Sequence, residues 1–160
     1  KFLVIGNINA ISYKECFDLI RSNKMWLGNN CVRHFEKPDG SRFESARSFW
    51  YTNLDTPKRH QELILYRQYS PGNYPKYDNY DAIDVSKAKD IPADFDGVMG
   101  VPITFLDKYN PNQFEIIGLS ASAGYSAEIV GIPFLGERDA RPLLNGKNLY
   151  ARMFIRKRQS

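Results

Sequence analysis

The stretch Lys1-Phe2-Leu3-Val4-Ile5-Gly6-Asn7 opens the chain with a nearly continuous apolar run. Such a run is typical of a strand that is buried on both faces in a parallel α/β sheet. A buried central strand has neighbours on both sides, and sequence before Lys1 is the natural source of some of them. We therefore expect Lys1–Asn7 to be an interior strand and the chain to be the later part of a longer protein.

A short helix and a second strand are predicted directly after this run. Ser12–Glu15 has the capping-box pattern, in which a hydroxyl and a carboxylate cap each other's backbone amides. Apolar residues recur at helical spacing at Tyr13, Phe17 and Ile20. Asn23 marks the expected end of the helix, and Met25–Leu27 resumes as a strand. Strand, helix and strand in this order predict a βαβ unit in a parallel sheet, with a right-handed crossover.

Turn residues and short β-rich runs dominate the rest of the chain. Lys37-Pro38-Asp39-Gly40 predicts a hairpin turn, because Pro fixes one φ angle and Gly supplies a positive one. The hairpin that it closes is expected to be partly exposed, with strands at Val32–Glu36 and Ser41–Glu44. Tyr69–Tyr80 reads as a loop rich in Pro, Gly, Asn and Tyr. Further strands are expected at 48–54, 62–66, 82–85, 97–104, 114–119 and 149–155. The predicted fold class is an α/β piece up to about residue 66, followed by a loop-rich, mostly β segment.

Composition excludes several classes of protein. The 160 residues have the size of one compact domain, and 42% hydrophobic with 25% charged residues is usual for a soluble globular chain. No apolar run approaches the roughly 18 residues that a membrane helix needs, so we expect no membrane partner. Cys16 and Cys31 lack CxxC spacing, which favours two reduced thiols in a cytoplasmic protein.

Charge is distributed unevenly along the chain. The net charge of +4 and the pI near 9.0 only mildly favour a polyanionic partner. Basic residues outnumber acidic ones from 56 to 77, whereas acidic residues outnumber basic ones from 78 to 96. Residues 152–158 then add basic side chains without an acid. This segregation favours a molecule with one basic face.

The usual catalytic and metal-binding signatures are mostly missing. The sequence has no GxGxxG or P-loop motif, no HExxH motif and no Cys/His cluster at ligand spacing. Asn110–Phe114 superficially resembles the Asn-Pro-Pro-Tyr/Phe motif of amino-methylating enzymes, but the second Pro is absent. A turn before a strand is the better prediction there. We expect no catalytic residue, no cofactor-binding residue and no metal ligand in this chain.

The stretch from Arg59 to Tyr80 interleaves tyrosines with basic residues. Basic side chains neutralise phosphates, while tyrosine rings stack on bases or fill the space of an extruded base. The alternative is a loop that packs its rings on its own domain, and the sequence leaves both interpretations open.

Long strings throughout the chain resemble one family, the adenine-specific DNA methyltransferases typified by the EcoRI modification enzyme. The strings occur in one collinear order: Phe2–Glu15, Trp26–Gly28, Trp50–Asp55, Lys58–His60, Tyr74–Ile83, Asp96–Leu106, Asn145–Lys147 and Ile155–Arg158. They cover almost the whole chain, and strings of this length are more specific than any single motif.

The resemblance implies a Rossmann-like methyltransferase, in which Lys1–Asn7 is the strand that follows the catalytic Asn-Pro-Pro-Phe motif. That motif and the S-adenosylmethionine site would then lie upstream of this sequence. The implied domains are 1–66, the remainder of the Rossmann-like methyltransferase domain, and 67–160, a target-recognition and DNA-binding region. The whole enzyme would methylate a flipped adenine at N6 in a restriction–modification system, whereas this chain alone would be inactive.

Double-stranded DNA is the partner that the resemblance implies. Asn7 and Asn9 follow the carboxyl end of a strand and are candidates for the border of the adenine pocket, although Asn7 could instead only cap the turn. Candidates for DNA contact are Lys58, Arg59, Arg67, Tyr74, Lys76, Tyr77, Lys147, Arg156, Lys157 and Arg158. For each basic residue the alternative is a solvated surface charge.

A different class of function remains open beside the enzyme. The chain could be a stand-alone DNA-binding or protein-interaction module without catalytic activity. The oligomeric state is not defined by the sequence, but apolar edges of a fragment would favour self-association.

Overall fold

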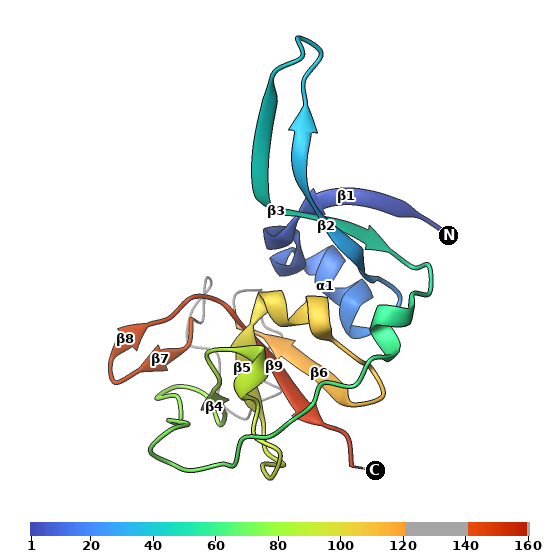
Figure 1. Ribbon diagram of the computed structural model, residues 1–160. Helices are drawn as coiled ribbons and strands as arrows, with labels where there is room; N and C mark the ends of the chain where they lie inside the picture. Colours follow the sequence, from blue (N-terminus) through green and yellow to red (C-terminus); the bar gives the residue numbers. More distant parts are fainter. Residues whose placement is uncertain (121–140, 160) are drawn as a thin grey trace. The chain divides into compact units, whose positions relative to one another are not determined.

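The computed structural model describes residues 1–120 and 141–159, and the chain divides into two compact units, Lys1–Arg59 and His60–Ser160. Figure 1 shows the elements of both units. Among the described residues, none of the helices is long and apolar enough to cross a membrane.

A three-stranded sheet with the order β1-β3-β2 forms the frame of the first unit. Strand β1 is Leu3–Asn7, β2 is Trp26–Glu36 and β3 is Arg42–Thr52. Both outer strands pair antiparallel with β3, so β1 and β2 run in the same direction with β3 between them. The two predicted strands are thus parallel in one sheet, as expected, but the antiparallel strand β3 lies between them, which the sequence did not predict. A tight hairpin brings β3 back beside β2, and β3 takes the position next to β1.

Strand β1 is an edge strand in the part of the chain that the structure describes. Its apolar side chains are exposed, with Leu3 at 53%, Val4 at 54% and Ile5 at 40%. The sequence predicted a strand buried on both faces, but only β3 lies beside it. An exposed apolar edge is a place where a further strand or covering element packs.

Two short helices connect β1 to β2 and supply the core of the first unit. The 3-10 helix η1 (Ile8–Ser12) leads into α1 (Lys14–Arg21). The capping-box prediction is wrong, because the Ser12 hydroxyl donates to the Asn9 carbonyl at 2.8 Å and Tyr13 is the N-cap of α1. The predicted stop is confirmed, since Asn23 has a φ of 56°. Buried side chains of this core are Ile8, Ile11, Phe17, Ile20, Leu27 and Tyr51.

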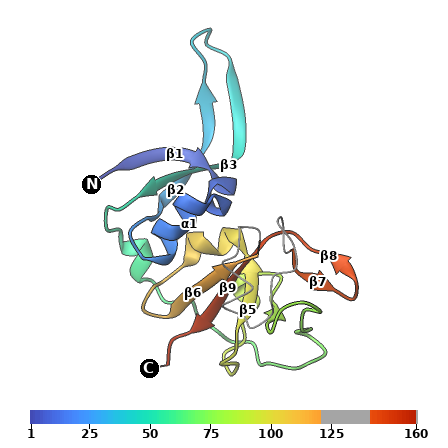
Figure 2. The same ribbon diagram turned by 180° about the vertical axis from the view of Figure 1, so that it is seen from behind.

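Strands β2 and β3 form a long hairpin that extends away from the rest of the first unit (Figure 2). Its turn is confirmed, because the Lys37 amide donates to the Ser41 carbonyl at 2.8 Å and Gly40 has a φ of 81°. The sequence predicted two strands here, Met25–Leu27 and Val32–Glu36, with a break at Gly28; the structure joins them in one strand, β2. Register shifts interrupt the pairing between Leu27 and Cys31 and between Val32 and His34.

The second unit contains a four-stranded sheet with the order β4-β5-β9-β6. The strands are β4 (Ile83–Asp84), β5 (Met99–Pro102), β6 (Phe114–Leu119) and β9 (Arg152–Lys157). β4 pairs parallel with β5, and β9 pairs antiparallel with β5 and with β6. Smaller elements are η2 (Pro57–His60), η3 (Ala88–Asp90), η4 (Ile103–Lys108), β7 (Leu143–Leu144) and β8 (Lys147–Asn148).

The four strands of this sheet lie close to their predicted places, but the strand predicted at 62–66 is absent. The reason lies in Gln113, whose side-chain amide binds both backbone groups of Leu63. The Leu63 amide donates to Gln113 Oε1 at 2.8 Å, and Gln113 Nε2 donates to the Leu63 carbonyl at 2.7 Å. The Gln113 side chain thus forms the hydrogen bonds with Leu63 that a neighbouring strand would otherwise form. The predicted turn before β6 is confirmed, because the Gln113 amide donates to the Asn110 carbonyl.

Tyrosines of the 69–80 loop build part of the core of the second unit. Tyr77 and Tyr80 are buried with Phe154 in one cluster, and their rings meet edge to face or tilted. The centroid of Tyr80 lies 4.7 Å from that of Phe154. The loop lacks regular secondary structure, as predicted, but it packs several rings on its own unit.

Candidate nucleic-acid interface

Asn7 and Asn9 lie together where β1 passes into η1. Asn7 Oδ1 accepts a hydrogen bond from the Asn9 amide at 2.9 Å, and Asn7 is the N-cap of η1. The capping alternative for Asn7 is therefore present in the structure. Both side chains are exposed, so the carboxyl end of this edge strand presents side-chain amide groups to solvent.

Arg59 is held inside the first unit. Its guanidinium lies 3.4 Å from the centroid of the Trp26 ring and donates to Asn23 Oδ1, and it lies 3.7 Å from Asp55. A buried guanidinium stacked on an indole is a structural cation–π contact. Lys58, beside it, donates to the Asn29 carbonyl at 3.2 Å and is partly exposed.

Tyr74 and Tyr77 are buried, and their hydroxyls bind groups of their own unit. The Tyr74 hydroxyl donates to the Asp90 carbonyl at 2.7 Å, and the Tyr77 hydroxyl donates to Asp84 Oδ1 at 2.6 Å. Burial raises the pKa of both phenols, with the Asp84 hydrogen bond and charge adding to the rise for Tyr77. Both rings therefore serve the fold, and we do not carry them into the set proposed to contact DNA.

Asp84 and Arg152 form a buried ion pair that the sequence did not indicate. Arg152 Nε donates to Asp84 Oδ1 at 3.0 Å, while Ser86 Oγ donates to Asp84 Oδ2 at 3.1 Å. The pair joins β4 to β9, which lie 68 residues apart in the sequence. Asp84 sits in a stretch of acids that resembles a solvated loop, so only the three-dimensional pairing reveals its burial.

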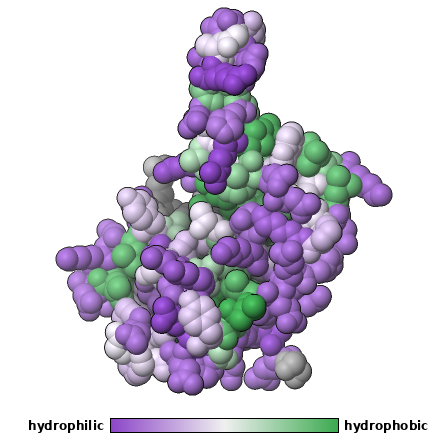
Figure 3. Space-filling view, viewed as in Figure 1, coloured by the Kyte–Doolittle hydropathy of each residue, from purple (hydrophilic) through white to green (hydrophobic). Residues whose placement is uncertain are grey.

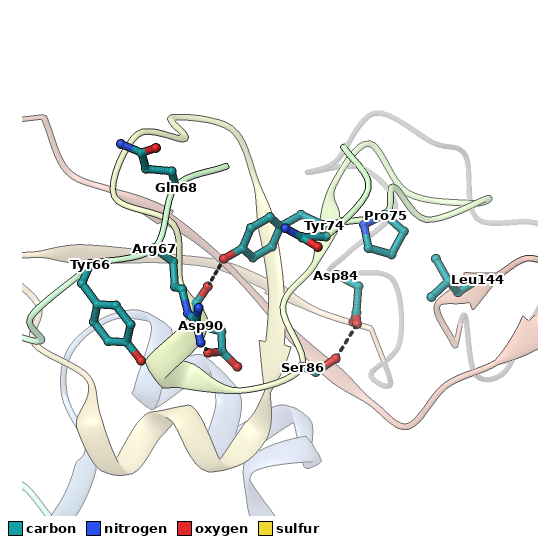
Figure 4. A pocket seen from close by; sticks show the side chains of 10 residues that line it. Tyr66, Arg67, Gln68, Tyr74, Pro75, Asp84, Ser86, Asp90 and Leu144 are labelled. Carbon is teal, nitrogen blue, oxygen red and sulfur yellow. Dashed lines mark hydrogen bonds and ion pairs between the residues drawn. The ribbon is translucent and has the colours of Figure 1, made fainter. Parts of the chain in front are cut away.

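Arg67 lines an open cavity of about 680 Å³ in the second unit (Figure 4). Its guanidinium lies 5.2 Å from the centroid of the exposed Tyr66 ring and its Nε lies 3.5 Å from Asp90 Oδ1. Figure 4 shows the Tyr74 hydroxyl directed at Asp90 on the same side of the cavity. The cavity thus presents a basic group and an aromatic ring at an open rim.

A second cavity of about 520 Å³ brings two sequence candidates together. Lys76 and Arg156 both line it, although they are 80 positions apart in the chain. Lys76 forms an ion pair with the exposed Asp81, and Arg156 lies opposite Glu115 in the β6–β9 ladder. Both basic side chains are exposed, which leaves them accessible to a polyanion.

The other C-terminal cations differ in their accessibility. Lys157 donates to the Ala93 carbonyl, lies 3.4 Å from Asp96 and is only 16% exposed, so its charge is engaged within the unit. Arg158 is exposed, with Nε donating to the Pro111 carbonyl at 2.8 Å. Lys147 is exposed beside the β7–β8 turn, where Gly146 has a φ of 73°.

No group of His, Cys, Asp and Glu that could hold a metal ion occurs among residues 1–120 and 141–159. The two cysteines are free thiols, and burial raises the pKa of Cys16.

Comparison with known proteins defines the class. The chain belongs to a family of adenine-specific methyltransferases: the family model described as adenine-specific methyltransferase EcoRI matches residues 1–158. The resemblance seen in the sequence is thereby confirmed.

The curated relatives that the chain matches are described as type II methyltransferases. The chain is 43% identical to the type II methyltransferase M.EcoRI of Escherichia coli, over 99% of the chain and 51% of that protein. It is 35% identical to M.MgeORF184P of Mycoplasma genitalium and 33% identical to M.MpnI of Mycoplasma pneumoniae, in each case over 57% of the relative. The chain thus spans about half the length of the curated relatives it matches. No solved structure matches it significantly.

Proposed function

We propose that the chain is the C-terminal part of a site-specific DNA adenine-N6 methyltransferase of a restriction–modification system. The family match over residues 1–158 carries this proposal, supported by relatives that are all described as type II methyltransferases. The intact enzyme would transfer a methyl group from S-adenosylmethionine to an adenine turned out of the duplex. This chain would contribute DNA recognition.

The turn that follows β1 does not fit S-adenosylmethionine. The strand-to-helix turn after β1 carries Gly6, but a side-chain carbon at Gly6 would lie 3.0 Å from the Tyr51 ring. This glycine therefore accommodates a neighbouring ring and does not open a cradle for a ligand. The next residue, Asn7, uses its side-chain oxygen on the Asn9 amide. We assign no reaction step to this chain, and the donor site belongs to the remainder of the proposed enzyme.

Residues 67–160 are proposed as the DNA-binding region, with the remainder of the methyltransferase domain at 1–66. The candidates that keep an exposed charge there are Arg67, Lys76, Lys147, Arg156 and Arg158. Exposed Arg and Lys side chains neutralise phosphates and release counterions, which gives affinity without sequence preference. Asn9 and Asn7 remain proposed for the border of the adenine pocket.

Methyl transfer by the full-length gene product that contains this chain tests the proposed activity. The product is incubated with labelled S-adenosylmethionine and duplex DNA, and the label in N6-methyladenine is measured. We expect label in the duplex and none in a duplex whose adenines are already methylated at the target site. DNA binding without any methyl transfer would instead support the stand-alone module.

Salt-dependent binding tests the proposed DNA-binding region. Arg156→Gln should weaken duplex binding at all sequences and lower the slope of log affinity against log salt by about 1. The matched control is Lys89→Gln, which removes the same charge from an exposed position within the acid-rich 78–96 stretch. Equal slopes for wild type and both variants would contradict the assignment of Arg156.

A further inference from the structure

The outer part of the β2–β3 hairpin, residues 33–47, is a two-stranded ribbon that we call the hairpin arm. All of its residues except Phe35 and Ser45 are exposed. Figure 3 shows mostly hydrophilic side chains over its outer part, and Figure 2 shows both strands extending beyond the sheet of the first unit. No core of this unit lies beneath the arm.

Cross-strand contacts join the two strands of the arm. The Phe35 and Phe43 rings are stacked with centroids 4.9 Å apart. His34 lies 3.5 Å from Glu44, and Arg42 lies 3.6 Å from Glu36. A two-stranded ribbon alone is marginally stable in water, so eleven-residue strands that outrun their core need a reason. Register shifts at the base add twist and bend, as bulges near functional sites do.

The two faces of the arm have different chemistry. Side chains alternate between the faces of a strand, so Arg33 and Phe35 share one face while His34 and Glu36 share the other. Arg33 Nε donates to Cys31 Sγ at 3.4 Å, which agrees with this alternation. The His34 face holds the cross-strand contacts of both glutamates, and Arg42 offsets the charge of Glu36 there. The Phe35 face combines two stacked rings with the Arg33 charge.

Acidic side chains of the arm are engaged within it. Glu36 pairs with Arg42 and Glu44 contacts His34, while Asp39 in the turn accepts hydrogen bonds from the Ser41 amide at 2.8 Å and from the Ser41 hydroxyl at 2.6 Å. The arm also carries the exposed cations Lys37 and Arg47. Its Phe35 face is therefore aromatic and basic, which complements a polyanion with apolar groups.

Duplex DNA is the occupant that this face fits. The major groove, about 12 Å wide, admits a two-stranded β-ribbon, and phenylalanine makes apolar contacts there with thymine methyl groups. We propose that the hairpin arm enters the major groove of the substrate DNA, with Phe35 and Phe43 against base edges and Arg33 on a phosphate. This inference rests on the proposed function. The first unit would then contact DNA in addition to the cations proposed for the second unit.

DNA binding by the full-length gene product tests this proposal. The probe is a duplex that contains the sequence that the enzyme methylates. The double variant Phe35→Ala/Phe43→Ala should weaken binding by about tenfold without changing the salt slope, since it removes apolar base contacts. Arg33→Gln should lower the salt slope by about 1. The matched control His34→Gln, on the opposite face of the same arm, should bind as wild type does.

Dimethyl sulfate footprinting adds a positional readout, because guanine N7 lies in the major groove. Wild type should protect guanines that the double variant leaves reactive, while circular dichroism shows that both are folded. Equal affinity and equal protection would overturn the groove proposal. So would a variant that keeps DNA affinity but loses association with a second protein chain. Wild type that neither binds nor methylates DNA would instead refute the proposed function.

Discussion

Asp84 lies between a phenol and a guanidinium in the core of the second unit. Its Oδ1 accepts from Tyr77 at 2.6 Å and from Arg152 at 3.0 Å. Asp84 is 7% and Arg152 12% exposed at the side chain, so each charge depends on the other for compensation. Removal of one partner from a buried pair leaves an uncompensated charge.

Asp84→Asn should therefore lower the free energy of unfolding by about 3–5 kcal/mol, as measured by urea denaturation. The matched control is Asp81→Asn, which breaks the ion pair with Lys76 at the surface and should cost less than about 1 kcal/mol. Equal losses for the two variants would contradict the burial described for Asp84.

Alkaline stability reports on the Tyr77 phenol. Its pKa is raised in the folded state, first by burial and then by Asp84. In the unfolded chain the same phenol ionises near pH 10. The phenol thus stabilises the fold below pH 10, and this contribution is lost as the pH rises further. Tyr77→Phe should make the decline in unfolding free energy above pH 10 shallower. Tyr150→Phe, at an exposed position, should leave the wild-type profile, and a similar profile for all three proteins would contradict the assignment.

Gly100 shows how one element constrains another. A side-chain carbon at Gly100 in β5 would overlap the Tyr77 hydroxyl. Gly100→Ala should lower the free energy of unfolding by about 1–3 kcal/mol, because the buried ring has no room to move. Gly72→Ala is the matched control, since a side-chain carbon there meets nothing within 4 Å. The two substitutions are compared by thermal unfolding, and similar midpoints would contradict the packing.

Local sequence predicted the elements better than their partners. The turn at Lys37–Gly40 could be predicted because the positive φ of Gly40 is a property of the turn itself. The pairing of β1 with β3 could not, since it joins residues more than forty positions apart. The strand expected at 62–66 is lost to Gln113, a side chain fifty positions away from Leu63.

The candidate interface divides along the same line. Residue types predicted which side chains could meet DNA, and exposed Lys76 and Arg156 agree with that expectation. Tyr77 is buried and is therefore not among the residues proposed to contact DNA, and Arg59 stacks on the Trp26 ring. Both placements depend on contacts that no local sequence pattern encodes. The sequence predicted the hairpin and its partial exposure, but not the length of the two strands beyond their core, on which the role proposed for the hairpin arm depends.

The exposed β1 edge is an apolar surface of the first unit. The isolated chain 1–160 should self-associate with rising concentration, because Leu3, Val4 and Ile5 present apolar side chains on an edge that no other strand of the described residues pairs with. Val4→Lys should reduce this association in sedimentation velocity. Ile64→Lys, which changes an exposed apolar residue of the second unit, is the control and should associate as wild type does. A wild-type chain that stays monomeric at all concentrations would contradict the prediction.

Mapping of methylated adenines in cellular DNA tests the central claim most directly. The full-length gene product is expressed in a host without adenine methyltransferases, and its genomic DNA is sequenced by a method that detects N6-methyladenine. We expect methylation of adenines within one short recurrent sequence. Genomic DNA that stays unmethylated while the folded protein is present in the cells would contradict it.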